Sequence, residues 1–258
     1  MAAMGQSIVS VGGVMLCIGH RGAMGHAPEN TLKSIAKALE LGVPWVEVDV
    51  YPVEGHLMVI HDHRLERTTN GSGYVWEKTY SYLRGLDAGQ GEKVPTLEEV
   101  LDLISNRAGI NIELKLPGSA ALVATVIQER IRTDWDVKKI LVSSFFHHEI
   151  AAVRQLDPRI RIGALIAGVP LDYARFAENL GAYSVHQSIE FVNREFIDDA
   201  HDRNLKVFVY TVNHPEDIAR MYALGVDGVF SNYPDRVLSF LGSKATRNPS
   251  GLRSPRIE

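Results

Sequence analysis

The chain has 258 residues, of which 45% are hydrophobic, and 27 basic residues against 31 acidic ones give a net charge of −4. That length fits one large domain and is typical of an eight-stranded α/β barrel. A mildly acidic chain without a Lys/Arg-rich run is a poor candidate for binding nucleic acid, so the few cations near its motifs should bind a small anion. The even spread of hydrophobic residues argues against a membrane protein.

The two ends and the single cysteine give expectations about the compartment. Cys17 is the only cysteine, which excludes an intrachain disulfide, and its apolar neighbours at 14–18 predict a buried thiol. Residues 1–13 hold no basic residue and no long apolar run, so we expect no secretory signal, no stable membrane association and a cytoplasmic protein. The polar, proline-bearing stretch at about 242–258 is expected to be a flexible tail.

Short apolar runs rich in Val and Ile alternate with helical patterns, which predicts parallel β/α units. The expected strands are at 14–18, 45–51, 57–61, 110–114, 140–144, 160–166, 182–186, 207–211 and 228–231. Between them, Asn30 or Thr31 can cap one helix, Thr96 opens a second with a capping box, and Pro215 announces a third.

Nine expected strands are one more than such a barrel needs. Only residues 52–56 separate the second from the third, too few for a crossover helix. A hairpin there would bring His61 almost opposite Val48, but the pattern leaves open which strand lies outside the barrel. The helix and strand rhythm also fails between His61 and Pro95, where a long polar and aromatic stretch is typical of an insertion that covers an active-site mouth.

Two carboxylates share one face of the second expected strand, because alternate residues of a strand point the same way. Glu47 and Asp49 lie on the face opposite Val46 and Val48. Taken alone, the segment could be an edge strand with its charges in water. Inside a barrel, unpaired carboxylates are costly, and a hard divalent cation such as Mg²⁺ or Ca²⁺ explains them better.

Glu113 and Lys115 repeat this pattern at the end of the fourth expected strand. Both side chains share a face, whereas Ile112 and Leu114 take the other. An ordinary ion pair at a strand end is one interpretation. The functional alternative makes Glu113 a third metal ligand and Lys115 a phosphate contact or a neighbour of the ligands.

His20 and Arg21 directly follow the first expected strand, between Gly19 and Gly22, which allow a sharp turn. The planar fork of an arginine binds phosphate oxygens in pairs. His61 ends another expected strand. Each histidine alone is more often structural, but two of them, with an arginine and acids between, suit general acid–base catalysis. No Gly-rich phosphate loop, Cys/His zinc pattern or Ser-His-Asp elbow in the sequence competes with this interpretation.

Two residues on late strands are candidates for a pocket wall. His186 ends the seventh expected strand, and Tyr210 lies on the eighth. For both, a purely structural role is an open alternative.

The ordered motifs resemble those of the glycerophosphodiester phosphodiesterase family over about residues 20–235. The resemblance is carried by HRG at 20–22, PEN at 28–30, EVDV at 47–50, HD at 61–62, LERTTNGSG at 65–73, VPTLEEVL at 94–101, NIELK at 111–115, SSF at 143–145, YTVN at 210–213 and GVDGVFSNYPD at 225–235. It implies an α/β fold, a TIM-type (β/α)8 barrel in one domain, with a small inserted subdomain at about 63–94. It also implies divalent-metal-dependent hydrolysis of small-molecule glycerophosphodiesters to glycerol 3-phosphate and an alcohol.

The matching motifs also imply residue roles. They assign acid–base catalysis to His20 and His61, metal binding to Glu47, Asp49 and Glu113, and phosphate contact to Arg21 and Lys115. Tyr210 stands where the family usually has tryptophan, which bears on the pocket for the glycerol or the leaving group.

Two other functions are weighed against this one. A lipid-active phospholipase of the C or D type could use the same barrel, but no amphipathic basic segment points to a membrane. A non-catalytic barrel that binds phosphorylated metabolites would be expected to have lost part of the acid–base or metal set, which is complete here. The sequence leaves open a homo-oligomer, the metal, the released alcohol and the order in which the histidines act.

Overall fold

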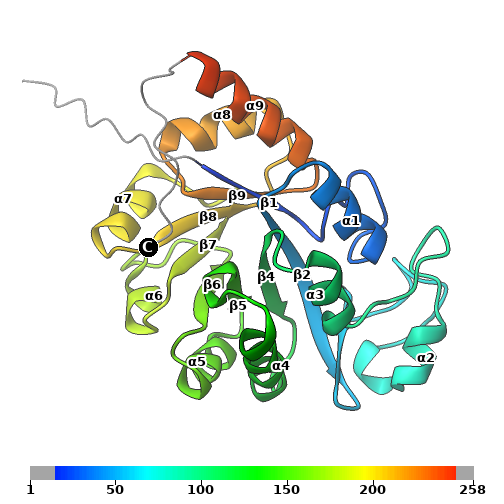
Figure 1. Ribbon diagram of the computed structural model, residues 1–258. Coiled ribbons are helices and arrows are strands. Elements are labelled where there is room, and N and C mark those ends of the chain that lie inside the picture. The colour runs from blue at the N-terminus through cyan, green and yellow to red at the C-terminus, as the bar shows by residue number, and fades with distance from the viewer. Residues whose placement is uncertain (1–14, 248–258) are drawn as a thin grey trace, which may run out of the picture.

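The structure is a computed structural model that describes residues 15–247. Eight parallel strands form a closed barrel, with helices on its outside (Figure 1). The barrel strands are β1 (Leu16–Gly19), β2 (Trp45–Val53), β4 (Gly109–Leu114), β5 (Ile140–Ser144), β6 (Arg161–Ile166), β7 (Ser184–Ser188), β8 (Lys206–Tyr210) and β9 (Gly228–Ser231). The helices around it are α1 (Leu32–Glu40), α3 (Leu97–Ile104), α4 (Ala120–Thr133), α5 (His147–Leu156), α6 (Arg175–Asn179), α7 (Arg194–Asp202), α8 (Pro215–Leu224) and α9 (Pro234–Arg247), with a 3-10 turn η2 (Val137–Lys139) before β5. The predicted TIM-type barrel is confirmed.

The barrel closes through the pairing of β1 with β2, and the third strand along the chain stays outside it. β1 pairs with both β9 and β2, whereas β3 (His56–Val59) pairs among the strands only with β2, antiparallel to it. The register sets Val50 opposite Val59, and the Ile60 N–H donates to the Asp49 carbonyl at 3.1 Å. The predicted hairpin is therefore confirmed, and it carries the chain to His61 beside the carboxyl end of β2.

The predicted helix starts follow from the residues at each start. Thr31, rather than Asn30, caps α1, since its side chain accepts from the Ser34 N–H. Thr96 and Glu99 form the predicted capping box of α3. α8 begins at Pro215. The side chains of Thr31, Thr96 and Glu99 each accept a hydrogen bond from a backbone N–H that has no partner within its helix, whereas α8 has no side-chain cap and begins at a proline, which has no N–H.

Some predicted boundaries were wrong. β7 begins two residues later than expected, because the Ala182 N–H donates to the Ala177 carbonyl and so ends α6. A flexible tail was expected from about residue 242, but residues 242–247 belong to α9, which packs Phe240 and Leu241 against the barrel core. The rest of that tail, the start at 1–13 and the first residue of the strand expected at 14–18 lie outside the described residues.

The segment 63–94 packs on the hairpin rather than on the barrel core. It holds η1 (Val75–Glu77) and α2 (Tyr80–Gly85), and its buried residues include Leu65, Val75 and Leu83. These side chains join hairpin residues in a hydrophobic cluster separate from the large barrel core. The insertion at about 63–94 and the one-domain boundary at 1–258 stay predictions. Among residues 15–247, no helix is both long and apolar enough to cross a bilayer.

Candidate active site

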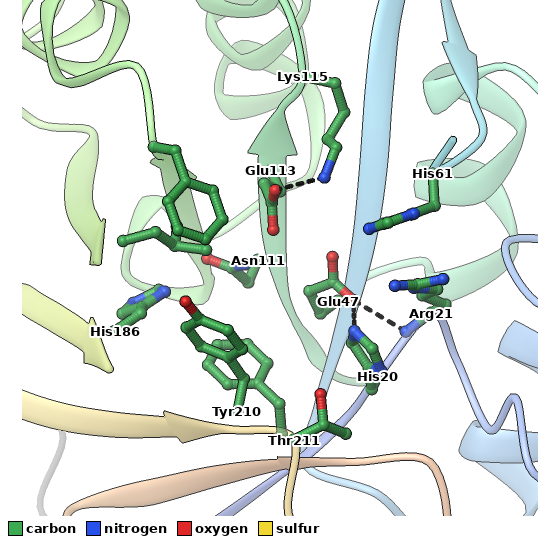
Figure 2. Close-up of a pocket in the computed structure, with 13 residues that line it drawn as sticks. His20, Arg21, Glu47, His61, Asn111, Glu113, Lys115, His186, Tyr210 and Thr211 are labelled. Carbon is green, nitrogen blue, oxygen red and sulfur yellow. Dashed lines mark hydrogen bonds and ion pairs between the residues drawn. The ribbon is translucent and has the colours of Figure 1, made fainter. Parts of the chain in front are cut away.

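A cavity of about 260 Å³ opens at the carboxyl ends of the barrel strands (Figure 2). This is the end at which parallel barrels place their active sites, because the loops that follow the strands meet there. The lining residues are His20, Arg21, Glu47, His61, Asn111, Glu113, Lys115, Phe145, Leu165, His186, Tyr210, Thr211 and Phe230. The predicted site residues thus come together in one place, with Asp49 buried beside them.

Strand alternation turns the carboxylates inward. Val46 and Val48 belong to the barrel core, whereas Glu47 and Asp49 are 2% and 1% exposed on the other face of β2. The parallel register between β2 and β4 sets Asp49 opposite Glu113. The alternative of an edge strand with its charges in water is excluded, since β2 lies between two barrel strands.

The three carboxylates fit a hard divalent cation. One oxygen from each of Glu47, Asp49 and Glu113 lies within 4.8 Å of the others, and Glu47 Oε1 is buried without a hydrogen-bond donor. Burial and the charge of Asp49 raise the pKa of Glu113 to about 7, and the same causes raise the pKa of Glu47 well above its usual range. Oxygen ligands that repel one another in a buried position are what Mg²⁺ or Ca²⁺ binds.

Two cations partly neutralise this cluster. Lys115 Nζ lies 2.6 Å from Glu113 Oε1 and 3.2 Å from Asp49 Oδ1, and Arg21 Nε lies 3.6 Å from Asp49 Oδ2. Burial opposes the charge on Asp49, but Lys115, His61 and Arg21 outweigh it and lower the pKa of Asp49 to about 2. Lys115 therefore forms the predicted ion pair with Glu113 and also lines the cavity.

The loop after β1 turns sharply enough to aim Arg21 at the carboxylates. The loop backbone is left-handed at Arg21 (φ 51°) and at Gly22 (φ 84°). The backbone N–H of Arg21 donates to Glu47 Oε2 at 2.8 Å. A Cβ on Gly19 would lie 2.4 Å from the Gly22 carbonyl oxygen. Glycine is thus required at Gly19 for space and favoured at Gly22 for its conformation.

Each candidate histidine is held through its Nδ1 atom. Nδ1 of His20 lies 2.6 Å from Asn232 Oδ1, and Nδ1 of His61 lies 2.6 Å from Asp62 Oδ1. Because both partners offer oxygen acceptors, Nδ1 carries the proton and Nε2 is left to exchange one. Burial and the charge of Arg21 lower the pKa of His20 to about 4; burial also lowers that of His61, with Asp49 and Asp62 opposing.

Arg67 connects the two sides of the site, and the sequence did not predict this role. It donates two hydrogen bonds to the Asp62 carboxylate, which holds His61, and two to Glu29, which holds Arg21 at 2.6 Å. Arg67 lies in the segment 63–94, which has no periodic pattern from which its direction could be inferred. Asn232 was likewise missed as a partner of His20, because it lies 212 residues away in the sequence.

The remaining wall of the cavity is mostly aromatic or neutral. The Tyr210 hydroxyl donates to the Ile166 carbonyl at 2.9 Å, and burial lowers the pKa of the fully buried His186 to about 3. Both candidates for the pocket wall do line the cavity. Asn111 was missed, although it stands two residues before Glu113 on the same face and donates to Ser143 Oγ at 2.9 Å.

Comparisons with known proteins agree on one family. The model of the glycerophosphoryl diester phosphodiesterase family matches residues 20–236. A glycerophosphodiester phosphodiesterase of Caldanaerobacter subterraneus subsp. tengcongensis is 33% identical over 88% of this chain and 97% of its own, and one of Bacillus altitudinis is 35% identical over 85% and 95%.

Solved structures give the same result. An Oleispira antarctica phosphodiesterase in complex with the product sn-glycerol-3-phosphate has a TM-score of 0.82 and 32% identity, covering 89% of this chain and 97% of its own. The comparisons favour neither a lipid-active phospholipase nor a non-catalytic binding barrel. The chain belongs to the glycerophosphoryl diester phosphodiesterase family, and it is an enzyme of that class.

Proposed function

We propose that this enzyme hydrolyses glycerophosphodiesters to glycerol 3-phosphate and an alcohol, with a divalent cation and with two histidines as acid–base catalysts. The observation that carries the proposal is the meeting of three buried carboxylates, two oriented histidines, an arginine and a lysine in one cavity. The product bound to the Oleispira antarctica relative supports glycerol 3-phosphate as the product here.

The carboxylates would bind the metal ion, and the two cationic side chains would bind the phosphate. Glu47, Asp49 and Glu113 would hold Mg²⁺ or Ca²⁺, which polarises phosphoryl oxygens when bound. Arg21 would bind phosphate oxygens through its fork, and Lys115 would contact the phosphate as a point charge. Stabilisation of the negative charge that builds on phosphorus is the largest contribution expected from this set.

The two histidines would move protons at the reacting oxygens. The glycerol hydroxyl next to the phosphorylated carbon attacks phosphorus and gives its proton to Nε2 of one histidine. The bond from phosphorus to the alcohol oxygen breaks, and the other histidine protonates that oxygen. Water then opens the cyclic phosphate and yields glycerol 3-phosphate, with the proton transfers reversed. An intramolecular nucleophile is favoured because it is already within reach of phosphorus.

The cyclic route is tested with a substrate that lacks the attacking hydroxyl. We expect a 2-deoxy analogue of glycerophosphoethanolamine to react at least about 10²-fold more slowly, and ³¹P NMR to detect a five-membered cyclic phosphate from the normal substrate. Equal rates for the two substrates, without a cyclic species, would show direct attack by water.

The metal assignment is tested with Glu47→Gln, which keeps the shape of the side chain and removes its charge. The rate of hydrolysis should fall. The affinity for Mg²⁺ or Ca²⁺, measured by calorimetry, should fall as well. A variant with unchanged metal affinity and only a lower melting temperature would show that Glu47 is structural.

A further inference from the structure

A second cavity, of about 760 Å³, adjoins the catalytic one. It shares His61, Glu113, Lys115 and Phe145 with the catalytic cavity. We call it the aromatic groove, after its apolar wall of Tyr51, Trp76, Leu114, Leu116, Phe145 and Phe146. The groove is thus a continuation of the site toward the segment 63–94, from which Trp76 comes.

Rings of the aromatic wall stack on their neighbours although the wall is partly open to solvent. Trp76 is 44% exposed, yet its ring stacks with Tyr74 at 4.9 Å and with Tyr51 at 6.4 Å between centroids. From the barrel side, Phe146 is also 44% exposed, at the position directly before α5. Exposed aromatic side chains that gather beside a catalytic cavity mark a surface that a ligand covers.

The charged residues of the groove are already paired. Arg64 binds Glu66, Asp62 binds Arg67 and Lys115 binds Glu113. The rest of the lining consists of aromatic and aliphatic side chains and of the imidazole rings of His61 and His63. The groove is lined by two carboxylates, Asp62 and Glu113, and by two cations, Arg64 and Lys115, so their formal charges cancel and the groove suits a neutral apolar group.

The position of His61 relates the groove to the reaction. His61 lines both cavities, whereas His20 lines the catalytic cavity and not the groove. A phosphodiester whose phosphate contacts Arg21 and Lys115 would keep one branch in the catalytic cavity and send the other past His61. We propose that the groove binds the alcohol branch of the diester and selects alcohols that carry an apolar, aromatic group. This inference rests on the proposed function and adds to it the class of leaving group.

The experiment compares two diesters whose leaving alcohols have similar acidity. Glycerophosphoethanol and glycerophospho-2-phenylethanol differ by one phenyl ring, and glycerophosphocholine supplies a cationic alcohol. We expect kcat/KM to be at least about tenfold higher with the phenylethyl diester than with the ethyl diester, because the ring is removed from water against Trp76 and Phe146. The choline diester should fall below the phenylethyl one.

Variants locate the effect within the protein. Trp76→Ala and Phe146→Ala, on two different segments, should bring the phenylethyl-to-ethyl ratio of kcat/KM close to one. Tyr82→Ala is the control, because Tyr82 is similarly exposed in the segment 63–94 but does not line the groove. It should keep the wild-type ratio.

The possible results separate this inference from the proposed function. Equal kcat/KM for the ethyl and phenylethyl diesters, or the highest value for the choline diester, would overturn the inference while leaving hydrolysis intact. A wild-type ratio in both Trp76→Ala and Phe146→Ala would also overturn it. No release of glycerol 3-phosphate from any of the three diesters would contradict the proposed function and the inference together.

Discussion

Arg67→Ala should lower turnover strongly although Arg67 is half exposed and touches neither cavity. The guanidinium donates two hydrogen bonds to Asp62 and two to Glu29, and these carboxylates hold His61 and Arg21. Without Arg67, both carboxylates lose a charged partner and the two site residues lose their orientation. The perturbation therefore reaches an acid–base residue and a phosphate contact at once.

The expected magnitude follows from comparing two effects. Exposed ion pairs stabilise a fold by only about 1 kcal/mol or less, so the melting temperature should fall by a few degrees at most. Misplacing a catalytic group by about 1 Å costs on the order of 10² in rate, and loss of a residue that orients a ligand or base costs about 10- to 100-fold. We expect kcat for glycerophosphoethanolamine to fall about 10- to 100-fold, with Arg67→Lys intermediate because lysine lacks the fork.

The assay is steady-state release of glycerol 3-phosphate, with the melting temperature measured on the same samples. Arg203→Ala is the matched control, since Arg203 also joins two carboxylates, Asp199 and Glu178, but on the outer helices. It should leave kcat unchanged. If Arg67→Ala keeps kcat within about twofold of the wild type, or loses activity only in proportion to unfolded protein, the orienting role is refuted.

Three further predictions concern the catalytic pair, the carboxylates and the thiol. His20→Ala and His61→Ala should each lower kcat by about 10² to 10⁴, and near-full activity in both would end the acid–base account. Because the pKa of Glu113 is raised to about 7 in the fold, chelated protein should lose thermal stability as the pH rises from about 4.5 through 7, and Glu113→Gln should lose less, since only the raised pKa of Glu47 then contributes. A parallel loss in both proteins would contradict this cause. Burial raises the pKa of Cys17 to about 12, so a disulfide reagent at pH 8 should label it only after unfolding; rapid labelling of native protein would disprove its burial.

Periodicity predicted the parallel β/α units and the shared face of the carboxylates, because both depend on local rules, whereas the closed TIM-type barrel was implied by the resemblance to the family. Alternation along β2 is enough to turn Glu47 and Asp49 away from the hydrophobic face, and the short connection at 52–56 is enough to require a hairpin. Which strand lies outside the barrel was not local information, since it depends on the closing contact between β1 and β2.

The sequence alone could not predict the contacts that orient the site residues, because these contacts also depend on the tertiary fold. Asn232 meets His20 only because β9 lies beside β1, and Arg67 meets Glu29 only because the segment 63–94 folds back over the loop after β1. Neither residue stands in a repeating pattern. Motif order could suggest that these residues matter, but their hydrogen-bond partners follow only from the tertiary fold.

The central claim is tested most directly by measuring glycerol 3-phosphate released from glycerophosphocholine and glycerophosphoethanolamine with Mg²⁺, with Ca²⁺ and with a chelator. We predict release that depends on the added metal and stops with the chelator. Folded protein that releases no glycerol 3-phosphate with either metal, or that releases it equally well in the chelator, would contradict metal-dependent hydrolysis at this site.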